Sequence, residues 1–220
     1  MRSFGSSGWR LSLNSDQATH LILYVRDACQ LNATGYDVPP PLVGEVEIVE
    51  LGLSLEDQRT TSEEWLSWWR RFIHVESQVQ LDFRSEEERG DLDGRAARTV
   101  RTSVFDPLEE FQSLRETPLL RDAARKSWRQ GAKWTKMYQS REVGHGLPIA
   151  RTVAESFAQQ RQVSPERVRA YVLLLNVTGK WSCLSEPGVL LCSCETFKDE
   201  VQFEFELEGV FESGLNRPSD

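Results

Sequence analysis

The residues whose types and spacing could support a function are basic. The window from Arg115 to Arg141 holds eight Lys or Arg residues and two acidic ones, so it carries +6, and the other 193 residues must total −14 to give the net charge of −8. A basic surface on an acidic body attracts an acidic partner. The charge pattern therefore predicts a binding surface, although it does not identify the partner.

One helix is expected to position these charges, running from about Leu119 to about Arg141. At 100° per residue, five of its basic residues fall within one third of the circumference and span roughly 22 Å along the axis. These candidate binding residues are Arg121, Arg125, Arg129, Lys133 and Lys136. Small residues occupy the opposite side, which predicts that the basic stripe faces outward. The prediction requires that Gly131 does not break the helix.

An acidic protein surface or a phosphate backbone would relieve the repulsion between like charges along this stripe. The chain's own carboxylates could do the same, because a run of charge is commonly a solvated or internally neutralised face. We expect an acidic protein partner ahead of nucleic acid, since a body of net charge −8 repels phosphate. The nucleic-acid alternative would add Arg95, Arg98 and Arg101 to the stripe.

A second indication of nucleic-acid binding lies between residues 152 and 171. The segment resembles a helix-turn-helix in which Ser164-Pro165-Glu166 opens the recognition helix. The register argues against this interpretation, because with Ala154 at the small-residue position the link to Val163 is about four residues too long. The apolar run Val172–Val177 also predicts a buried strand.

The sequence contains none of the motifs typical of nucleotide-binding loops, serine hydrolases or zinc proteases. His20 and His74 are expected on the polar faces of their helices. His145, between two glycines, lies in a loop suited to catalysis, so an enzyme without a recognisable motif that uses His145 is the third hypothesis. We predict no catalytic residue, no cofactor and a binding protein rather than an enzyme.

The cysteines could bind a metal only if their spacing matched a known ligand pattern. The four are Cys29, Cys183, Cys192 and Cys194. A zinc site commonly shows paired cysteines two to four residues apart, and only one closer pair is present here. We therefore predict buried thiols and no metal site.

In the N-terminal half, Asn14-Ser15-Asp16 predicts the start of a helix that runs to Cys29, with a strand over Thr19–Val25 as the alternative. Gly44–Leu51 is expected to be a strand. A capping box at Thr61 and Glu64 predicts the start of a tryptophan-rich helix. Its apolar face is Trp65, Trp68, Trp69, Phe72 and Ile73. We expect this face to anchor a core, with an exposed docking groove as the alternative.

In the C-terminal half, Asp106-Pro107 is expected to open a helix that ends at Pro118. A further helix is predicted over Ile149–Gln162. Apolar runs predict strands over Tyr171–Val177 and Val189–Cys194, and strict alternation predicts a last one over Val201–Glu208. No regular βαβ alternation appears. The fold class is therefore α+β, with helices and a small, mostly antiparallel sheet whose strands are concentrated in the C-terminal third.

The expected domain organisation is a lobe of residues 1–83, a charged loop or linker of 84–105, a lobe of 106–213 and a tail of 214–220. We expect no signal peptide and no membrane span. Only five of the 26 basic residues are lysine, a bias typical of GC-rich coding. These features predict a bacterial cytoplasmic protein that acts by binding, as an adaptor, an immunity-type protein or a complex subunit.

Overall fold

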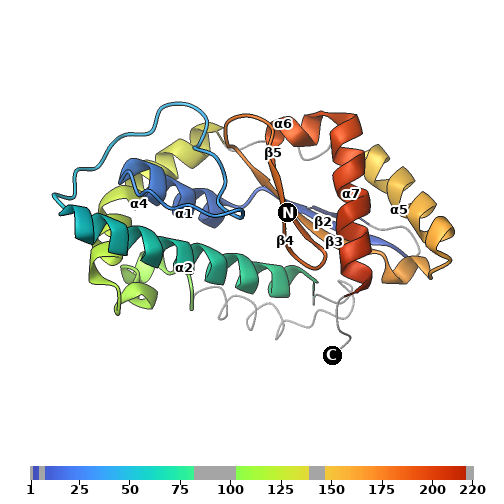
Figure 1. Ribbon diagram of the computed structural model, residues 1–220, viewed down its shortest axis with the longest axis horizontal. Helices are drawn as coiled ribbons and strands as arrows, with labels where there is room; N and C mark the ends of the chain where they lie inside the picture. The colour runs from blue at the N-terminus through green and yellow to red at the C-terminus, as the bar shows by residue number, and fades with distance from the viewer. Residues whose placement is uncertain (1, 5–7, 82–102, 139–146, 217–220) are drawn as a thin grey trace. The chain divides into compact units, whose positions relative to one another are not determined.

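The computed structural model describes residues 2–4, 8–81, 103–138 and 147–216 (Figure 1). The chain divides into two compact units, one formed by Met1–Asp16 with Ser140–Asp220 and one by Gln17–Gln139. We call them the sheet unit and the helical unit. The expected linker at 84–105 falls almost entirely outside the described residues. The helical unit includes both the tryptophan-rich helix and the basic helix, which the expected lobes 1–83 and 106–213 had separated.

Within its described residues, the sheet unit contains five strands in the order β1-β2-β3-β5-β4. Their bounds are β1 Arg2–Phe4, β2 Arg10–Asn14, β3 Arg169–Leu175, β4 Ser182–Glu186 and β5 Val189–Ser193. Strand β3 pairs in parallel with both β2 and β5, whereas β1 and β4 pair antiparallel with their neighbours. The α+β class predicted from the sequence is confirmed, and three of the strands lie in the C-terminal third. The sheet is mixed rather than mostly antiparallel, because β2 comes from the N-terminus to lie beside β3.

Two helices, α5 (Leu147–Arg161) and α7 (Glu200–Leu215), pack together and cover one face of this sheet (Figure 1). The register places Leu13 opposite Val172 and Val172 opposite Leu190, so one row of apolar side chains crosses three strands. This row is buried in one cluster with aromatic rings of the two helices. The short helix α6 (Cys194–Lys198) connects β5 to α7. The predicted helix at Ile149–Gln162 and the predicted strands at Tyr171–Val177 and Val189–Cys194 are confirmed within two residues at most ends.

The segment Val201–Glu208 is helix α7, so the predicted last strand is wrong. Asp199 caps the helix, since its carboxylate accepts a hydrogen bond from the backbone N–H of Gln202 at 3.1 Å. The helix buries Phe203, Leu207, Val210 and Phe211, at the three- and four-residue spacing of one helical face. The alternation of apolar and polar residues indicated a strand. A helix forms instead, because the apolar residues continue at helical spacing through residues 207–211 and are buried together on one face.

The helix-turn-helix interpretation is also wrong. After α5 the chain makes a single 3-10 turn over Pro165–Arg167, labelled η4, and then enters β3. No second helix follows α5 in this segment, which the structure describes throughout. Val168 and Ala170, which would belong to a recognition helix, are buried in the sheet core.

The helical unit is built around α1 (Gln17–Ala28), which packs against both α2 (Leu55–Leu81) and α4 (Pro118–Tyr138). Residues 19–26 of α1 are all buried. This complete burial explains why the sequence also fitted a strand at Thr19–Val25, an alternative that the structure excludes. His20 lies within this buried stretch, so its predicted position on a polar face is wrong, whereas His74 of α2 is exposed as expected.

The tryptophans of α2 form part of the core of the helical unit, as the favoured prediction stated. Each of the three indole N–H groups donates a hydrogen bond to the carbonyl of a different segment: Trp65 to Ile22 at 2.9 Å, Trp69 to Asp37 at 2.9 Å and Trp68 to Val104 at 2.7 Å. The rings of Trp65 and Trp69 stack with centroids 5.9 Å apart. These side chains therefore join three segments to α2 and do not form an exposed docking groove.

Three local predictions in the helical unit are wrong. Helix α2 begins at Leu55, two turns before the predicted capping box, and Ser54 caps it by accepting a hydrogen bond from the N–H of Asp57 at 3.1 Å. Gly44–Leu51 has no regular secondary structure. Asp106-Pro107 opens only the 3-10 turn η2 (Pro107–Glu109), followed by a second one, η3 (Gln112–Leu114). Pro118 begins α4 rather than ending a helix, consistent with the preference of proline for the first turn.

None of the helices in the described ranges is both long enough and apolar enough to cross a bilayer.

Arg70 of α2 forms a two-point ion pair with Asp37. Its Nε and terminal nitrogen donate to the two carboxylate oxygens at 2.7 and 2.9 Å. The hydrogen bonds from Arg70 hold the pKa of Asp37 below its usual value. Asp37 is buried, while the Arg70 side chain is 51% exposed, so solvent screens part of the attraction.

This pair predicts a pH-dependent contribution to stability. Because the pKa of Asp37 is lower in the folded state, the contribution is present above the unfolded pKa of about 3.9 and is lost as the pH falls through the folded pKa. Arg70→Gln should lower the free energy of unfolding by about 1 kcal/mol or less at pH 6, and the difference from the wild type should shrink progressively as the pH is lowered below the unfolded pKa of about 3.9. Urea denaturation over a series of pH values from 6 downward measures this difference. Arg71→Gln, at the exposed neighbouring position, is the control, and an Arg70→Gln effect that does not shrink as the pH falls would contradict the assignment.

Candidate functional site

Helix α4 is continuous from Pro118 to Tyr138, as the basic-stripe prediction required. Gly131 does not interrupt the helix. This position faces α1, and a Cβ atom there would lie 2.8 Å from Leu21 Cδ2 and 3.0 Å from the Tyr24 ring. The absence of a side chain lets the two helices approach closely. The buried side of α4 is Leu120, Ala123, Ala124, Ser127, Gly131, Trp134 and Thr135. The opposite side is therefore left for the charged residues.

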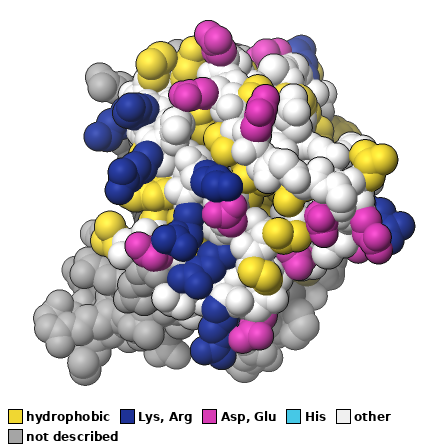
Figure 2. Space-filling view, turned by 90° about the vertical axis from the view of Figure 1, so that its left-hand side faces the viewer, with side chains coloured by type: hydrophobic (Ala, Val, Ile, Leu, Met, Phe, Trp, Pro, Cys, Tyr) yellow, Lys and Arg dark blue, Asp and Glu magenta, His cyan; other side chains and the backbone are white. Residues whose placement is uncertain are grey.

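The structure places four of the five predicted binding residues on the exposed side of α4. Arg125, Arg129, Lys133 and Lys136 are exposed, and Arg121 is half-buried. The face drawn in Figure 2 carries a band of Lys and Arg side chains with Asp and Glu among them. The stripe is thus an exposed surface, and its two ends differ in how they are paired.

The N-terminal half of the stripe has hydrogen-bond and ion-pair partners close by. Glu110, in the turn before α4, accepts a hydrogen bond at its backbone carbonyl from Arg121 Nε at 2.9 Å. Its carboxylate lies 3.1 Å from a terminal nitrogen of Arg125. One turn along, Lys126 pairs with Asp122 at 2.7 Å. The role of Glu110 was not predicted, because nothing in the sequence indicates that the turn folds back onto the helix.

The C-terminal half has fewer partners. Arg129 lies over the ring of Trp128, with its guanidinium carbon 5.9 Å from the ring centroid. Lys133 and Lys136 are exposed, and neither forms an ion pair with any residue that the structure describes. We call Arg129, Lys133 and Lys136 the open basic segment. Among the described residues, no carboxylate pairs with it.

A cavity of about 610 Å³ adjoins the open basic segment. Its walls come from α4, from the irregular segment 45–48 and from Tyr24 of α1. They include Tyr24, Glu45, Val46, Glu47, Ile48, Gln130, Lys133, Trp134, Met137 and Tyr138. Two apolar side chains beside it are well exposed, Met137 at 74% and Ile48 at 50%. The sequence could not indicate this cavity, because residues 45–48 were expected to form a strand.

The walls of this cavity combine polar and apolar groups. Trp134 Nε1 and Gln130 Oε1, two atoms of its lining residues, are buried and have no hydrogen-bond partner within the described residues. Burial raises the pKa of Tyr24 above its usual value, which already lies well above neutral pH. The stacked rings of Trp134 and Tyr138, 5.0 Å apart, provide an apolar wall.

The other candidates from the sequence are either buried or outside the described residues. His145, proposed for the enzyme hypothesis, and the arginines at 95, 98 and 101 lie outside them. Cys29, Cys183 and Cys192 are buried, as predicted for core thiols, and burial raises the pKa of Cys29 to about 11. Within the described ranges, no three His, Cys, Asp or Glu residues are grouped closely enough to hold a metal ion.

Comparison with known proteins finds no matching family model, no matching curated protein and no matching solved structure.

Proposed function

We propose that the protein is a non-enzymatic binding protein that engages an acidic protein partner through the open basic segment of α4. The observation that supports this most is the difference between the two ends of the helix. Near the N-terminal end Arg125 and the neighbouring Lys126 pair with carboxylates, whereas Lys133 and Lys136 form no ion pair with a residue that the structure describes. Adaptor, immunity-type and complex-subunit roles would all use such a surface.

The surroundings of the open basic segment favour a protein partner over nucleic acid. Glu45 and Glu47 line the same cavity as Lys133, and their carboxylates would repel phosphates and a partner's carboxylates alike, so the apolar side chains beside the cavity distinguish the two kinds of partner. Met137 and Ile48 offer apolar contacts that a protein side chain can use. A partner with carboxylates around one or two apolar anchors would match both features. The net charge of −8 also opposes nucleic acid.

The test compares two triple variants that remove the same charge from the same helix. Arg129→Gln, Lys133→Gln and Lys136→Gln neutralise the open basic segment, whereas Arg121→Gln, Arg125→Gln and Lys126→Gln neutralise the paired half. The ligand used is a fluorescent Glu-rich peptide with two leucines. At about 0.2–1 kcal/mol per exposed charge, three charges contribute about 0.6–3 kcal/mol, so the first triple variant should weaken binding roughly 3- to 160-fold. The second triple variant should weaken it clearly less than the first.

A second measurement separates the protein partner from nucleic acid. A short DNA duplex and a single-stranded RNA are titrated at low and at moderate salt. Absence of binding at low salt supports the proposal. Tight DNA or RNA binding that weakens steeply with salt, or equal peptide binding by both triple variants, would contradict it.

A further inference from the structure

Helix α7 carries a second apolar row that its own core does not use. Val201 is 79% exposed and Phe205 70% exposed, and both lie on the side away from the buried face formed by Phe203 and Leu207. Their spacing of four residues places them one above the other on the helix, and Gly209 continues the same row. These two residues made the segment look like a strand. In the structure they remain on the surface.

Gly209 leaves a gap in this row. A Cβ atom at this position would meet no atom within 4 Å, so packing within the described residues does not require glycine here. Glycine is also a poor choice for an exposed helix interior, because it is less stable there than alanine. By contrast, Gly214 near the end of the same helix is constrained, since a Cβ atom there would lie 2.8 Å from the carbonyl oxygen of Arg169. Neither packing nor helix stability within the described part of the sheet unit therefore favours a glycine at position 209.

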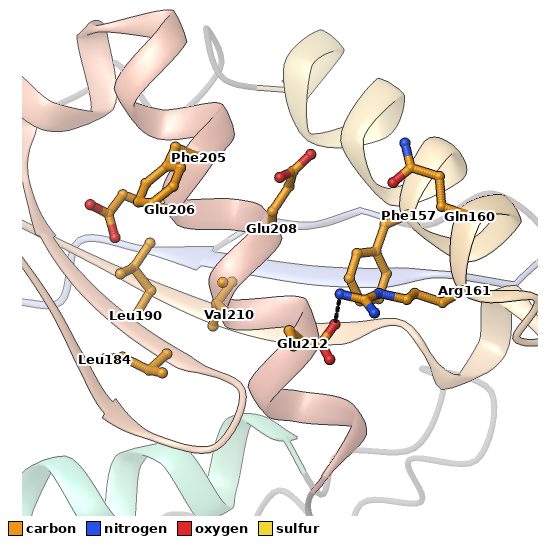
Figure 3. A pocket seen from close by; sticks show the side chains of 11 residues that line it. Phe157, Gln160, Arg161, Leu184, Leu190, Phe205, Glu206, Glu208, Val210 and Glu212 are labelled. Atoms are coloured by element: carbon orange, nitrogen blue, oxygen red, sulfur yellow. Dashed lines mark ion pairs between the residues drawn. The ribbon is translucent and has the colours of Figure 1, made fainter.

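A groove of about 370 Å³ runs over α7 at this gap (Figure 3). Figure 3 shows Leu184 and Leu190 of the β4–β5 hairpin on one side of α7, and Phe157 and Arg161 of α5 on the other. Leu184 is 45% exposed. The groove thus joins two apolar walls across the helix, and the missing side chain at 209 lets a partner's backbone come close to α7.

The groove is acidic at its rim. Helix α7 contains five glutamates and no Lys or Arg: Glu200, Glu204, Glu206, Glu208 and Glu212. Arg161 is a basic residue in the lining, and it pairs with Glu212 at 2.7 Å. Glu206 accepts hydrogen bonds from Ser182 and Gln202, both at 2.7 Å. Glu204 and Glu208 are exposed and remain available to a cation.

We infer that the exposed face of α7 formed by Val201, Phe205 and Gly209, together with Leu184 of β4, is a docking site for a basic amphipathic helix of a partner protein. The partner's bulky apolar side chains would lie against Phe205 and Leu184, and its backbone would cross α7 at Gly209. Its Lys and Arg side chains would pair with Glu204 and Glu208. The site lies in the sheet unit and does not depend on the function proposed for α4.

The test uses the full-length chain and three synthetic peptides of about 16 residues, which match the roughly 24 Å length of the 16-residue α7. The first has Leu and Phe on one helical face and Lys and Arg on the other. The second has the same composition in an order without an apolar face. In the third, Glu replaces Lys and Arg. Fluorescence anisotropy should show the first binding at least about tenfold more tightly than the other two.

The deciding variant is Gly209→Leu, which fills the gap from a position with open space around it. It should weaken binding of the first peptide about tenfold or more while leaving the melting temperature unchanged or higher. Glu208→Lys should weaken binding in a salt-dependent way. Ser156→Leu and Glu155→Lys make the same kinds of change at exposed positions of α5 outside the groove and should leave binding unchanged.

The following outcomes would overturn the inference. One is full affinity in Gly209→Leu, which would show that the peptide does not occupy the groove. The other is equal binding of the first and second peptides, which would reduce the interaction to unspecific charge attraction. Loss of binding in the α4 triple variant but not in Gly209→Leu would likewise place the peptide elsewhere.

Discussion

Replacing Trp65 with alanine is expected to lower the free energy of unfolding by about 3–5 kcal/mol, a large part of the total stability of a typical domain. Trp65 is fully buried, donates a hydrogen bond to the Ile22 carbonyl and stacks on Trp69. The guanidinium carbon of Arg26 also lies 5.5 Å from its ring centroid. Alanine would leave a cavity between α1 and α2 and remove the indole hydrogen bond to the Ile22 carbonyl of α1. Urea denaturation followed by circular dichroism measures the change.

Two control variants separate the contributions at this position. Trp65→Phe keeps most of the apolar volume but removes the donor to Ile22, so it should cost clearly less than Trp65→Ala. Trp128→Ala removes an indole that is only half-buried on α4 and should cost less than Trp65→Ala. If Trp65→Ala and Trp128→Ala had similar effects, α2 would not be the core helix described above.

Gly131→Val should lower the free energy of unfolding by about 1–3 kcal/mol, as expected when extra atoms are forced into a packed interface. The new Cβ atom alone would approach Leu21 Cδ2 to 2.8 Å. Leu21 and Tyr24 are both buried, so neither side chain has open space to move into. Chemical denaturation measures the loss.

The matched control is Ala132→Val, one residue further along α4. This position is half-buried, and valine there costs a few tenths of a kcal/mol in helix propensity relative to alanine, whereas Gly131→Val gains propensity because glycine is the poorer helix former. If Gly131→Val nevertheless lowers the free energy of unfolding by clearly more than Ala132→Val, the extra loss comes from crowding against α1. Equal effects would mean that α1 and α4 do not meet at Gly131.

The helical elements could be predicted where one apolar period dominated the sequence. The face from Trp65 to Ile73 and the helix with Gly131 both had a clear three- and four-residue spacing, and both were found. The start of α2 was missed because the first two turns, from Leu55, are largely exposed and show no such period. These first turns are helical because they extend the buried part of α2, and not because their own side chains pack against a core. Their sequence therefore shows little helical periodicity of apolar residues.

The prediction for α7 failed for a different reason. Val201 and Phe205 alternate with glutamates, as in a half-buried strand, but the structure leaves both exposed. The sequence pattern does not distinguish an apolar residue on the surface from one in the core. The exposure of Val201 and Phe205 becomes evident only once Phe203 and Leu207 are known to be the buried residues.

The candidate site could be predicted in part. The exposed stripe and the continuity of α4 follow from helical geometry and from the small residues on its inner side. The division of the stripe into a paired and an open half could not be predicted, because Glu110 reaches Arg125 through the fold of a turn. The cavity next to Lys133 depends on an irregular segment from a distant part of the sequence.

The discontinuous sequence of the sheet unit has a consequence for how the protein is made. Leu13 of β2 pairs with Val172 of β3, and 158 residues lie between them in the sequence. At about 5–20 residues per second, the first strands wait roughly 8–30 s for their central neighbour. The whole helical unit is translated during that interval. The nascent chain can therefore complete its helices while the apolar row of β2 is still uncovered, and that interval is when the chain most needs protection from aggregation.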